Sequence, residues 1–131
     1  MVEMAKTSEG KPPNADEKLM AAISHAGIII GGILVALIVW LVQKDKSKYV
    51  GFQAKQALVY QLVVLVGEGI LGVVVFVLGV LTFGIGFFIL VPLLVIIGLG
   101  TLVYGLYAAY KTYSGEEFRY WIIADVLEKK T

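Results

Sequence analysis

Glu68 is the residue whose type and position most suggest chemistry. The chain runs for 55 residues from Gln56 to Tyr110, and Glu68 is the only Asp, Glu, Lys or Arg among them. An ionised carboxylate at the centre of a bilayer costs about 2.5–3.5 kcal/mol on insertion scales. We therefore expect Glu68 to be protonated, paired or facing water inside a helical bundle. It is either a proton or cation site or a neutral, hydrogen-bonded helix contact, and the structural interpretation is favoured.

The depth of Glu68 in the membrane predicts its partners. If the apolar run folds back near residues 82–86, its two halves are antiparallel. The depth of each residue below the membrane edge can then be calculated from a helix rise of about 1.5 Å per residue. Glu68 then lies about 17 Å, and Thr101 about 14 Å, from the same membrane edge. Gln61 and Tyr104 are similarly level with each other. The sequence therefore predicts a polar seam of Gln61, Glu68, Thr101 and Tyr104 between the two helices.

His25 is the second candidate, because it is the single histidine of the chain and lies near the start of an apolar segment. A histidine in such a place can act as a proton-linked switch, since its ordinary pKa lies near physiological pH. It is more often a hydrogen-bonded helix contact, and that interpretation is favoured. With no second histidine and no Asp or Glu at ligand spacing, we predict no metal site.

Membrane helices are the elements that would position these residues. Hydrophobic residues make up 59% of the 131 residues and charged residues 16%, whereas soluble domains carry about a quarter charged residues. The apolar segment 19–42 would be about 36 Å long as a helix, enough to cross a hydrocarbon core of about 30 Å. The 55-residue run would be about 80 Å long as one helix, so it must fold back. The best break is at residues 82–86, which include two glycines.

We therefore predict an all-α membrane protein, with a bundle of three transmembrane helices at residues 19–42, 57–81 and 87–110. Residues 116–130 mix apolar and charged side chains and predict a C-terminal interfacial amphipathic helix. Residues 1–17 are polar and rich in helix breakers, which predicts a disordered tail before a single membrane domain at residues 18–131. Asn14 or Asp16 is expected to cap the first helix.

Basic residues predict the orientation. With three spans, the first loop and the C-terminal tail share one side and carry eight Lys and Arg, against three before residue 19. The positive-inside rule then places the N-terminus outside, and the first loop and C-terminus in the cytosol, of a multi-pass protein in the cell membrane.

Glycines are concentrated in the apolar region, which holds twelve of the fifteen. Small residues let membrane helices approach closely, and they form regular patterns here. The expected packing positions are Gly27 with Gly31, Gly72 with Gly79, and Gly105. They serve either packing within one chain or self-association, and the second use favours a homo-oligomer.

Several classes of function are excluded or disfavoured. The chain has no cysteine, which excludes disulfides, thiolate metal sites and a cysteine nucleophile. Its net charge of +1 gives no strong attraction to nucleic acid. No nucleotide-binding loop, serine-hydrolase elbow or zinc-protease motif is present. We predict no enzyme activity and no cofactor. The expected partners are the lipid bilayer and other membrane proteins or copies of the chain.

Three stretches carry a resemblance to a known family: residues 16–27, residues 49–58 and residues 115–120. Together they resemble a widespread family of small prokaryotic membrane proteins, which is similar in turn to the channel-type membrane subunit of the chloroplast Tic protein translocon. The resemblance covers roughly residues 16–131 and implies a membrane module that works with partners. Its motif residues here are Phe52, Gln53, Gln56, Arg119 and Tyr120. A contact between residues 53–56 and residues 119–120 would be a structural clamp or a docking surface.

Two functions stay open. The first is a non-enzymatic membrane protein, an interaction or translocon-like subunit, which predicts stable partners and tolerance of Glu68→Gln. The second is a small oligomeric channel or proton-coupled transporter that uses Glu68. Three spans do not supply the inverted repeats of typical transporters, so the first is preferred.

Overall fold

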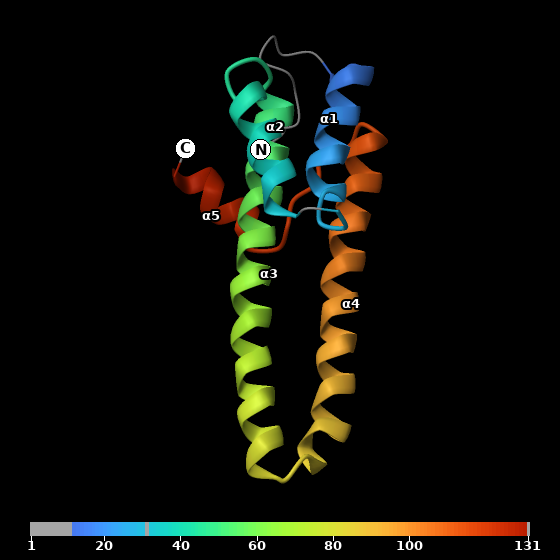
Figure 1. Cartoon of the computed structure of the whole chain (residues 1–131). Helices are drawn as coiled ribbons and strands as arrows, with labels where there is room; N and C mark the ends of the chain where they lie inside the picture. Colours follow the sequence, from blue (N-terminus) through green and yellow to red (C-terminus); the bar gives the residue numbers. More distant parts are fainter. Residues whose placement is uncertain (1–11, 31, 131) are drawn as a thin grey trace.

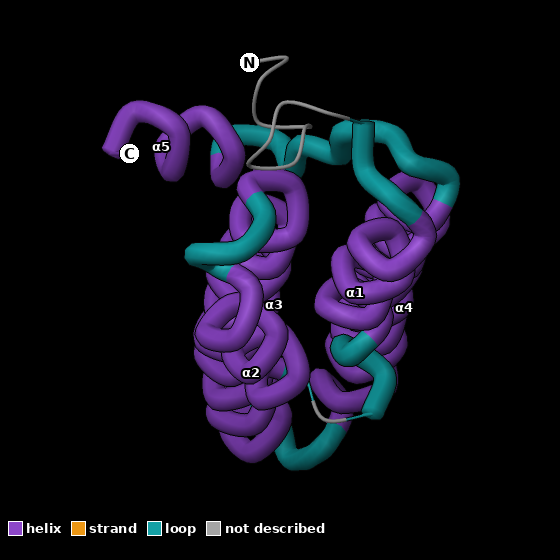
Figure 2. Tube along the Cα trace, turned by 90° about the horizontal axis from the view of Figure 1, so that it is seen from above, coloured by secondary structure: helices purple, strands orange, loops and turns teal. Residues whose placement is uncertain are grey.

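The computed structural model describes residues 12–30 and 32–130; within those ranges the chain is all-helical and forms no strand. The helices are α1 (Ala15–Ala26), α2 (Ile33–Gln43), α3 (Lys48–Leu81), α4 (Ile85–Tyr113) and α5 (Ile123–Lys130). Figure 1 shows α3 and α4 as two long helices joined at their lower ends, with α1 and α2 beside their upper halves. Seen from above, α1 lies against α4 and α2 against α3 (Figure 2).

The first predicted span is wrong, because residues 19–42 form two short helices and not one. Helix α1 ends at Ala26 and α2 begins at Ile33, and Figure 1 shows that α2 returns toward the end from which α1 came. Gly32 in the turn has φ +57, a backbone conformation that glycine adopts without strain. At 12 and 11 residues, each helix is about 17 Å long, too short to cross a bilayer. We call α1, the turn and α2 the re-entrant hairpin.

Helices α3 and α4 match the other two predicted spans and extend beyond them. Both are long and apolar enough to cross a membrane. The predicted break is confirmed: α3 ends at Leu81 and α4 begins at Ile85, with Phe83 and Gly84 at φ 56 and φ 90. Helix α3 begins nine residues earlier than predicted, at Lys48, where the Ser47 side chain accepts a hydrogen bond from the Val50 N–H. Among its described residues the structure therefore has two helices that are long and apolar enough to span a membrane, and the third predicted span is not confirmed.

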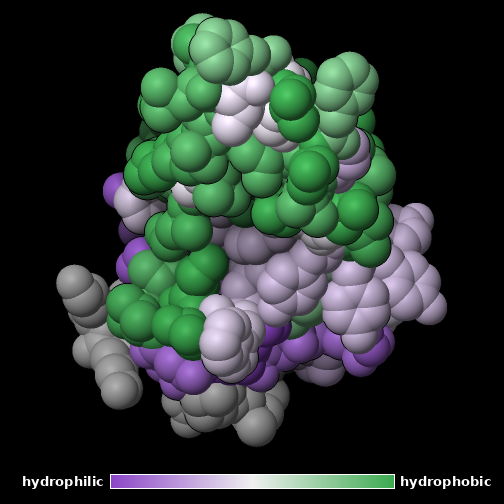
Figure 3. All heavy atoms as spheres, turned by 90° about the horizontal axis from the view of Figure 1, so that it is seen from below, coloured by the Kyte–Doolittle hydropathy of each residue, from purple (hydrophilic) through white to green (hydrophobic). Residues whose placement is uncertain are grey.

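The core lies in the upper half of the molecule. The buried residues of α3 all fall between Tyr49 and Gln61 except Gly79. The most apolar stretches of α3 and α4, in contrast, are 6% and 0% buried, unlike the core helix of a soluble protein. Figure 3, viewed from the end where α3 and α4 are joined, shows apolar side chains over most of this face and hydrophilic residues at its margin. This is the surface expected of helices that face lipid.

The start of α1 and the start of α3 lie at the same end of the molecule. Ser47 Oγ donates to Glu17 Oε2 at 2.5 Å, and the Tyr49 hydroxyl lies 2.7 Å from the Glu116 carbonyl oxygen and 3.1 Å from that of Thr112. The predicted orientation, with the N-terminus and the first loop on opposite sides of a membrane, is therefore not confirmed, because residues 14–18 and the loop at residues 43–47 lie at one end of the molecule. Residues 1–11 of the predicted tail lie outside the described part of the chain, and Asn14 caps α1 as predicted.

The C-terminal amphipathic helix is shorter than predicted. Residues 116–122 are not helical, and only α5, Ile123–Lys130, forms a helix. Its Ala124 and Leu127 pack against Phe52 of α3, while Val126 is exposed.

The predicted packing glycines divide into two groups. An added Cβ at Gly27, Gly79 or Gly105 would lie 2.6, 2.2 or 3.2 Å from a side chain of this chain, so these three permit close approach within the fold. At Gly72 an added Cβ would meet no atom of the described residues within 4 Å, so within that part of the chain nothing packs against it. Gly31 lies outside the described residues.

Candidate functional site

His25, in the last turn of α1, is fully buried and hydrogen-bonded through both ring nitrogens. Its Nε2 lies 3.0 Å from Gln53 Oε1, and its Nδ1 lies 3.0 Å from the Tyr120 hydroxyl. The Gln53 amide is held in one orientation, because its Nε2 donates to the Phe118 carbonyl at 3.0 Å. Gln53 Oε1 must therefore accept, which assigns the imidazole proton to Nε2 and makes Nδ1 the acceptor of the Tyr120 hydroxyl proton.

Gln56 closes the same network one turn further along α3. Its Nε2 donates to the Phe118 carbonyl at 2.8 Å, and its Oε1 accepts from the Tyr120 N–H at 2.8 Å. His25, Gln53 and Gln56 are all fully buried. We call His25, Gln53, Gln56, Phe118 and Tyr120 the C-terminal clamp, because they tie the non-helical segment after α4 to α1 and α3.

Aromatic rings exclude water from the C-terminal clamp. The Tyr60 ring stacks on Tyr120 with centroids 4.1 Å apart, and Tyr104 and Phe118 meet Tyr120 edge to face at 5.1 and 4.8 Å. Burial lowers the pKa of His25 to about 4, against a smaller opposing effect of its side-chain hydrogen bond. Burial also raises the pKa of Tyr120 above its usual range. The imidazole is therefore neutral and the phenol protonated at physiological pH, as the hydrogen bonds require.

Arg119 fastens the outer side of the segment to α5. Its guanidinium donates to Asp125 at 2.7 Å and to Glu128 at 3.1 Å, and it lies 5.8 Å from the centre of the Phe52 ring. The structure thus brings the motif residues of α3 and of the C-terminal segment together. Gln53, Gln56 and Tyr120 are buried against one another, which is the geometry expected of a clamp.

The predicted polar seam is only partly assembled. Thr101 Oγ1 and Glu68 Oε2 are hydrogen-bonded at 2.6 Å, as the depth arithmetic indicated. Gln61 instead donates from Nε2 to the Ser24 carbonyl at 3.0 Å, and the Tyr104 hydroxyl accepts from the Trp121 N–H at 3.1 Å. The partner of Gln61 lies in the re-entrant hairpin, and the partner of Tyr104 lies in the C-terminal segment. The sequence did not predict that either segment lies at this depth.

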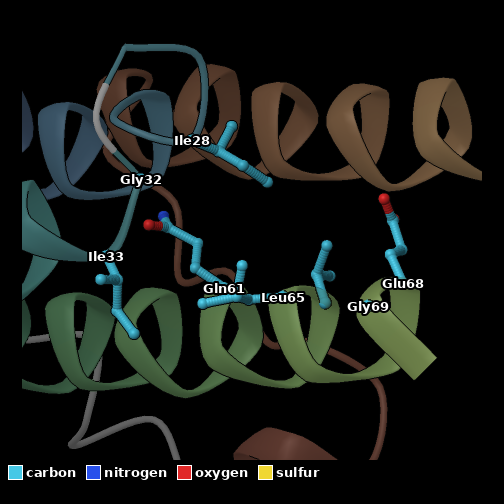
Figure 4. A pocket seen from close by; sticks show the side chains of 8 residues that line it. Ile28, Gly32, Ile33, Gln61, Leu65, Glu68 and Gly69 are labelled. Atoms are coloured by element: carbon cyan, nitrogen blue, oxygen red, sulfur yellow. The ribbon is translucent and has the colours of Figure 1, made fainter. Parts of the chain in front are cut away.

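Two cavities flank Glu68 below the tip of the re-entrant hairpin. One of about 390 Å³ lies between the tip and α3 and is lined by Gln61 and Glu68 among others, and one of about 400 Å³ extends to Thr101 and Gly98 of α4. Ile28, at the tip, borders both. Figure 4 shows Glu68 pointing toward α4, and Gln61 pointing toward the tip. Gln61 is 4% exposed, and its Oε1 has no hydrogen-bond partner.

Sequence reasoning missed Ser24, Tyr60 and the Phe118 carbonyl. Tyr60 could have been found, because a tyrosine beside Gln61 is unusual in an apolar run. The Phe118 carbonyl accepts from both Gln53 and Gln56, but a backbone acceptor leaves no signal in residue types. In the part of the chain that the structure describes, no group of three or more His, Cys, Asp or Glu could hold a metal ion.

Comparison with known proteins gives one match. Residues 16–127 match the sequence model of the MamF/MmsF family, described as the magnetosome magnetite crystal formation protein family. The match supports the expected small prokaryotic membrane family, and it does not support a similarity to the Tic translocon subunit. No curated protein and no solved structure was found to match the chain.

Proposed function

The chain belongs to the MamF/MmsF magnetosome membrane protein family, and we propose that it works as a non-enzymatic interaction module, through association with other membrane proteins or with copies of itself. The observation that carries the proposal is the C-terminal clamp. Its imidazole and its two amides use donor and acceptor atoms on one another and on the backbone, deep in the fold. A catalytic group has to reach a substrate, whereas these groups hold a segment in place.

The outer surface of the spanning helices supports association. Below the re-entrant hairpin, Gly67 and Gly72 of α3 and Gly100 of α4 have no atom within 4 Å of an added Cβ. Each leaves a shallow site in an apolar helix surface, and such sites let a second membrane helix approach closely.

We assign the end that carries the loop at residues 43–47 to the cytosol. All Lys and Arg residues of the chain precede Gln56 or follow Tyr110, and the turn between α3 and α4 has none. The positive-inside rule favours this orientation. In it the start of α1 is cytosolic too, which differs from the orientation expected for three spans.

The test is purification of the tagged full-length chain from native membranes in mild detergent, followed by quantitative mass spectrometry and light scattering. A membrane protein recovered in a fixed ratio, or a defined homo-oligomer, is the expected result. A monomer with no partner, both in detergent and in native nanodiscs, would overturn the proposal.

Matched glycine variants sharpen the test. Gly72→Leu and Gly100→Leu add the same bulk to open surfaces of α3 and α4, so both should fold. Loss of association in one variant and its retention in the other would assign the interface to one helix. If neither variant changes the complex, these two open glycine sites are not where the module associates.

A translocon-like role is the narrower form of the proposal, and a partner from protein transport would support it. A role in crystal formation is the second candidate, and the description of the matched family is what favours it. Elemental analysis of the vesicles recovered with the tagged chain separates the two, because only the second predicts vesicles enriched in iron.

A further inference from the structure

The position of Glu68 between two cavities points to a site that the clamp does not use. Glu68 lies 13 residues above the lower end of α3 at Leu81, which is about 20 Å along the helix. Among the described residues that line either cavity, it is the only titratable one: the tip contributes Ile28, Gly32 and Ile33, and α4 contributes none with a charge. An ionised Glu68 would thus be a carboxylate without a cation in an apolar region.

Thr101 connects Glu68 to the backbone of α4. Thr101 Oγ1 lies 2.6 Å from Glu68 Oε2 and 2.9 Å from the Gly98 carbonyl oxygen. A threonine hydroxyl has one proton and can donate only once. Both contacts are hydrogen bonds if Glu68 is a neutral acid that donates to Thr101 Oγ1, while Thr101 donates to Gly98. An ionised Glu68 would instead accept the hydrogen bond of the Thr101 hydroxyl, and Thr101 could then donate none to the Gly98 carbonyl.

We propose that Glu68 is a proton-binding site inside the membrane, held in its protonated form by Thr101 and reached through the cavities below the tip of the re-entrant hairpin. Deprotonation turns the Thr101 hydroxyl from Gly98 to Glu68. The titratable side chain tied to the same turn of α4 is Tyr60, whose hydroxyl donates to the Thr101 carbonyl at 2.7 Å. The inference does not depend on whether the chain associates with partners.

A small apolar carbodiimide tests the site in the full-length protein in lipid nanodiscs. The acid proton passes to a carbodiimide nitrogen as the carboxyl oxygen adds to the central carbon, and the O-acylisourea rearranges to a stable N-acylurea without a leaving group. We expect peptide mass spectrometry to find the adduct on Glu68, with a yield that falls as pH rises. Exposed Glu116 is the internal control, and Glu68→Gln should lose the adduct at this position.

Infrared spectroscopy gives a second readout that does not need the reagent. The carboxylic-acid C=O band at neutral pH should be present in the wild type and lost in Glu68→Gln, with the same helical content in both proteins. Thr101→Val removes the hydroxyl that accepts the acid proton, so the acid C=O band of Glu68 should remain and move to higher wavenumber. No acid band, or labelling of Glu68 no greater than that of Glu116, would overturn the proposal.

Discussion

Replacing Gln56 with leucine removes two hydrogen bonds of the C-terminal clamp while keeping the side-chain volume similar. Gln56 is fully buried, so water cannot replace the amide. The change leaves the Tyr120 N–H without its acceptor, and it leaves the Phe118 carbonyl with the Gln53 bond alone.

The magnitude follows from these two losses. A buried N–H without a partner costs about 1–3 kcal/mol, and the lost bond to Phe118 adds about 0.5–1.5 kcal/mol. Apolar contact of the leucine recovers part of this, so we expect Gln56→Leu to lower the free energy of unfolding by about 2–3 kcal/mol. That is a large fraction of the roughly 5–15 kcal/mol that holds a typical domain folded.

Gln61→Leu is the matched control, on the same helix and at similar burial. Gln61 makes one hydrogen bond, to the Ser24 carbonyl, while its own Oε1 is unpaired. Leucine removes that bond, so the Ser24 carbonyl oxygen loses this donor. It also removes the unpaired Oε1, so one unpaired oxygen replaces another. The expected cost is therefore only about 1 kcal/mol.

Both variants are compared with the wild type by denaturant titration in mixed micelles. Far-UV circular dichroism reports the helices, and tryptophan fluorescence in a Trp40→Phe background reports the surroundings of Trp121, which follows Tyr120. Limited proteolysis should show earlier cleavage between α4 and α5 in Gln56→Leu. Equal destabilisation by the two variants would refute the reasoning from unpaired buried groups.

Three further predictions concern packing, pH and the attachment of α5. Gly79→Ala should lower the unfolding midpoint, because its Cβ would lie 2.2 Å from the Phe87 ring, whereas Gly72→Ala should not. The pKa of His25 is about 4 in the fold against 6.5 when unperturbed, so the unfolded chain binds a proton that the fold excludes. Stability measured by the same titration should therefore fall as pH drops from 6.5 toward 4, by on the order of 3 kcal/mol in total, and His25→Gln should flatten the slope. Arg119→Ala should speed hydrogen exchange in α5 selectively, since the partly exposed ion pairs it loses are worth about 0–1 kcal/mol each; exchange that rises equally in α1 would contradict this.

The hydropathy pattern was sufficient to predict α3 and α4, and it was insufficient to predict that the first apolar segment turns back. A run of 55 residues exceeds any bilayer, so its length alone forces a turn, and the glycines near residue 84 locate it. Residues 19–42 have the right length for one span, and hydropathy depends on residue type and not on chain direction. Gly27 and Gly31 were interpreted as packing residues, and Gly32, which adopts the positive φ that turns the chain back, was not singled out.

The neighbours that the sequence did not predict also explain why the polar seam is only partly assembled. Levelling residues by helix rise predicted the Glu68–Thr101 pair, because α3 and α4 are regular helices at that depth. It failed for Gln61 and Tyr104, because it treated the two helices as each other's only neighbours. Their actual partners are Ser24 in α1 and Trp121 in the C-terminal segment.

The return of the re-entrant hairpin to its own end has a consequence for how the chain enters a membrane. In the proposed orientation, the connection between described helices that reaches the far side is the turn at residues 82–84, which has no charged side chain. Carrying a Lys or Arg to the bilayer centre costs about 2.5–3.5 kcal/mol on insertion scales, and the segment from Gln56 to Tyr110 has neither. The chain is thus suited to insert α3 and α4 together as one pre-paired unit, without translocating a hydrophilic domain.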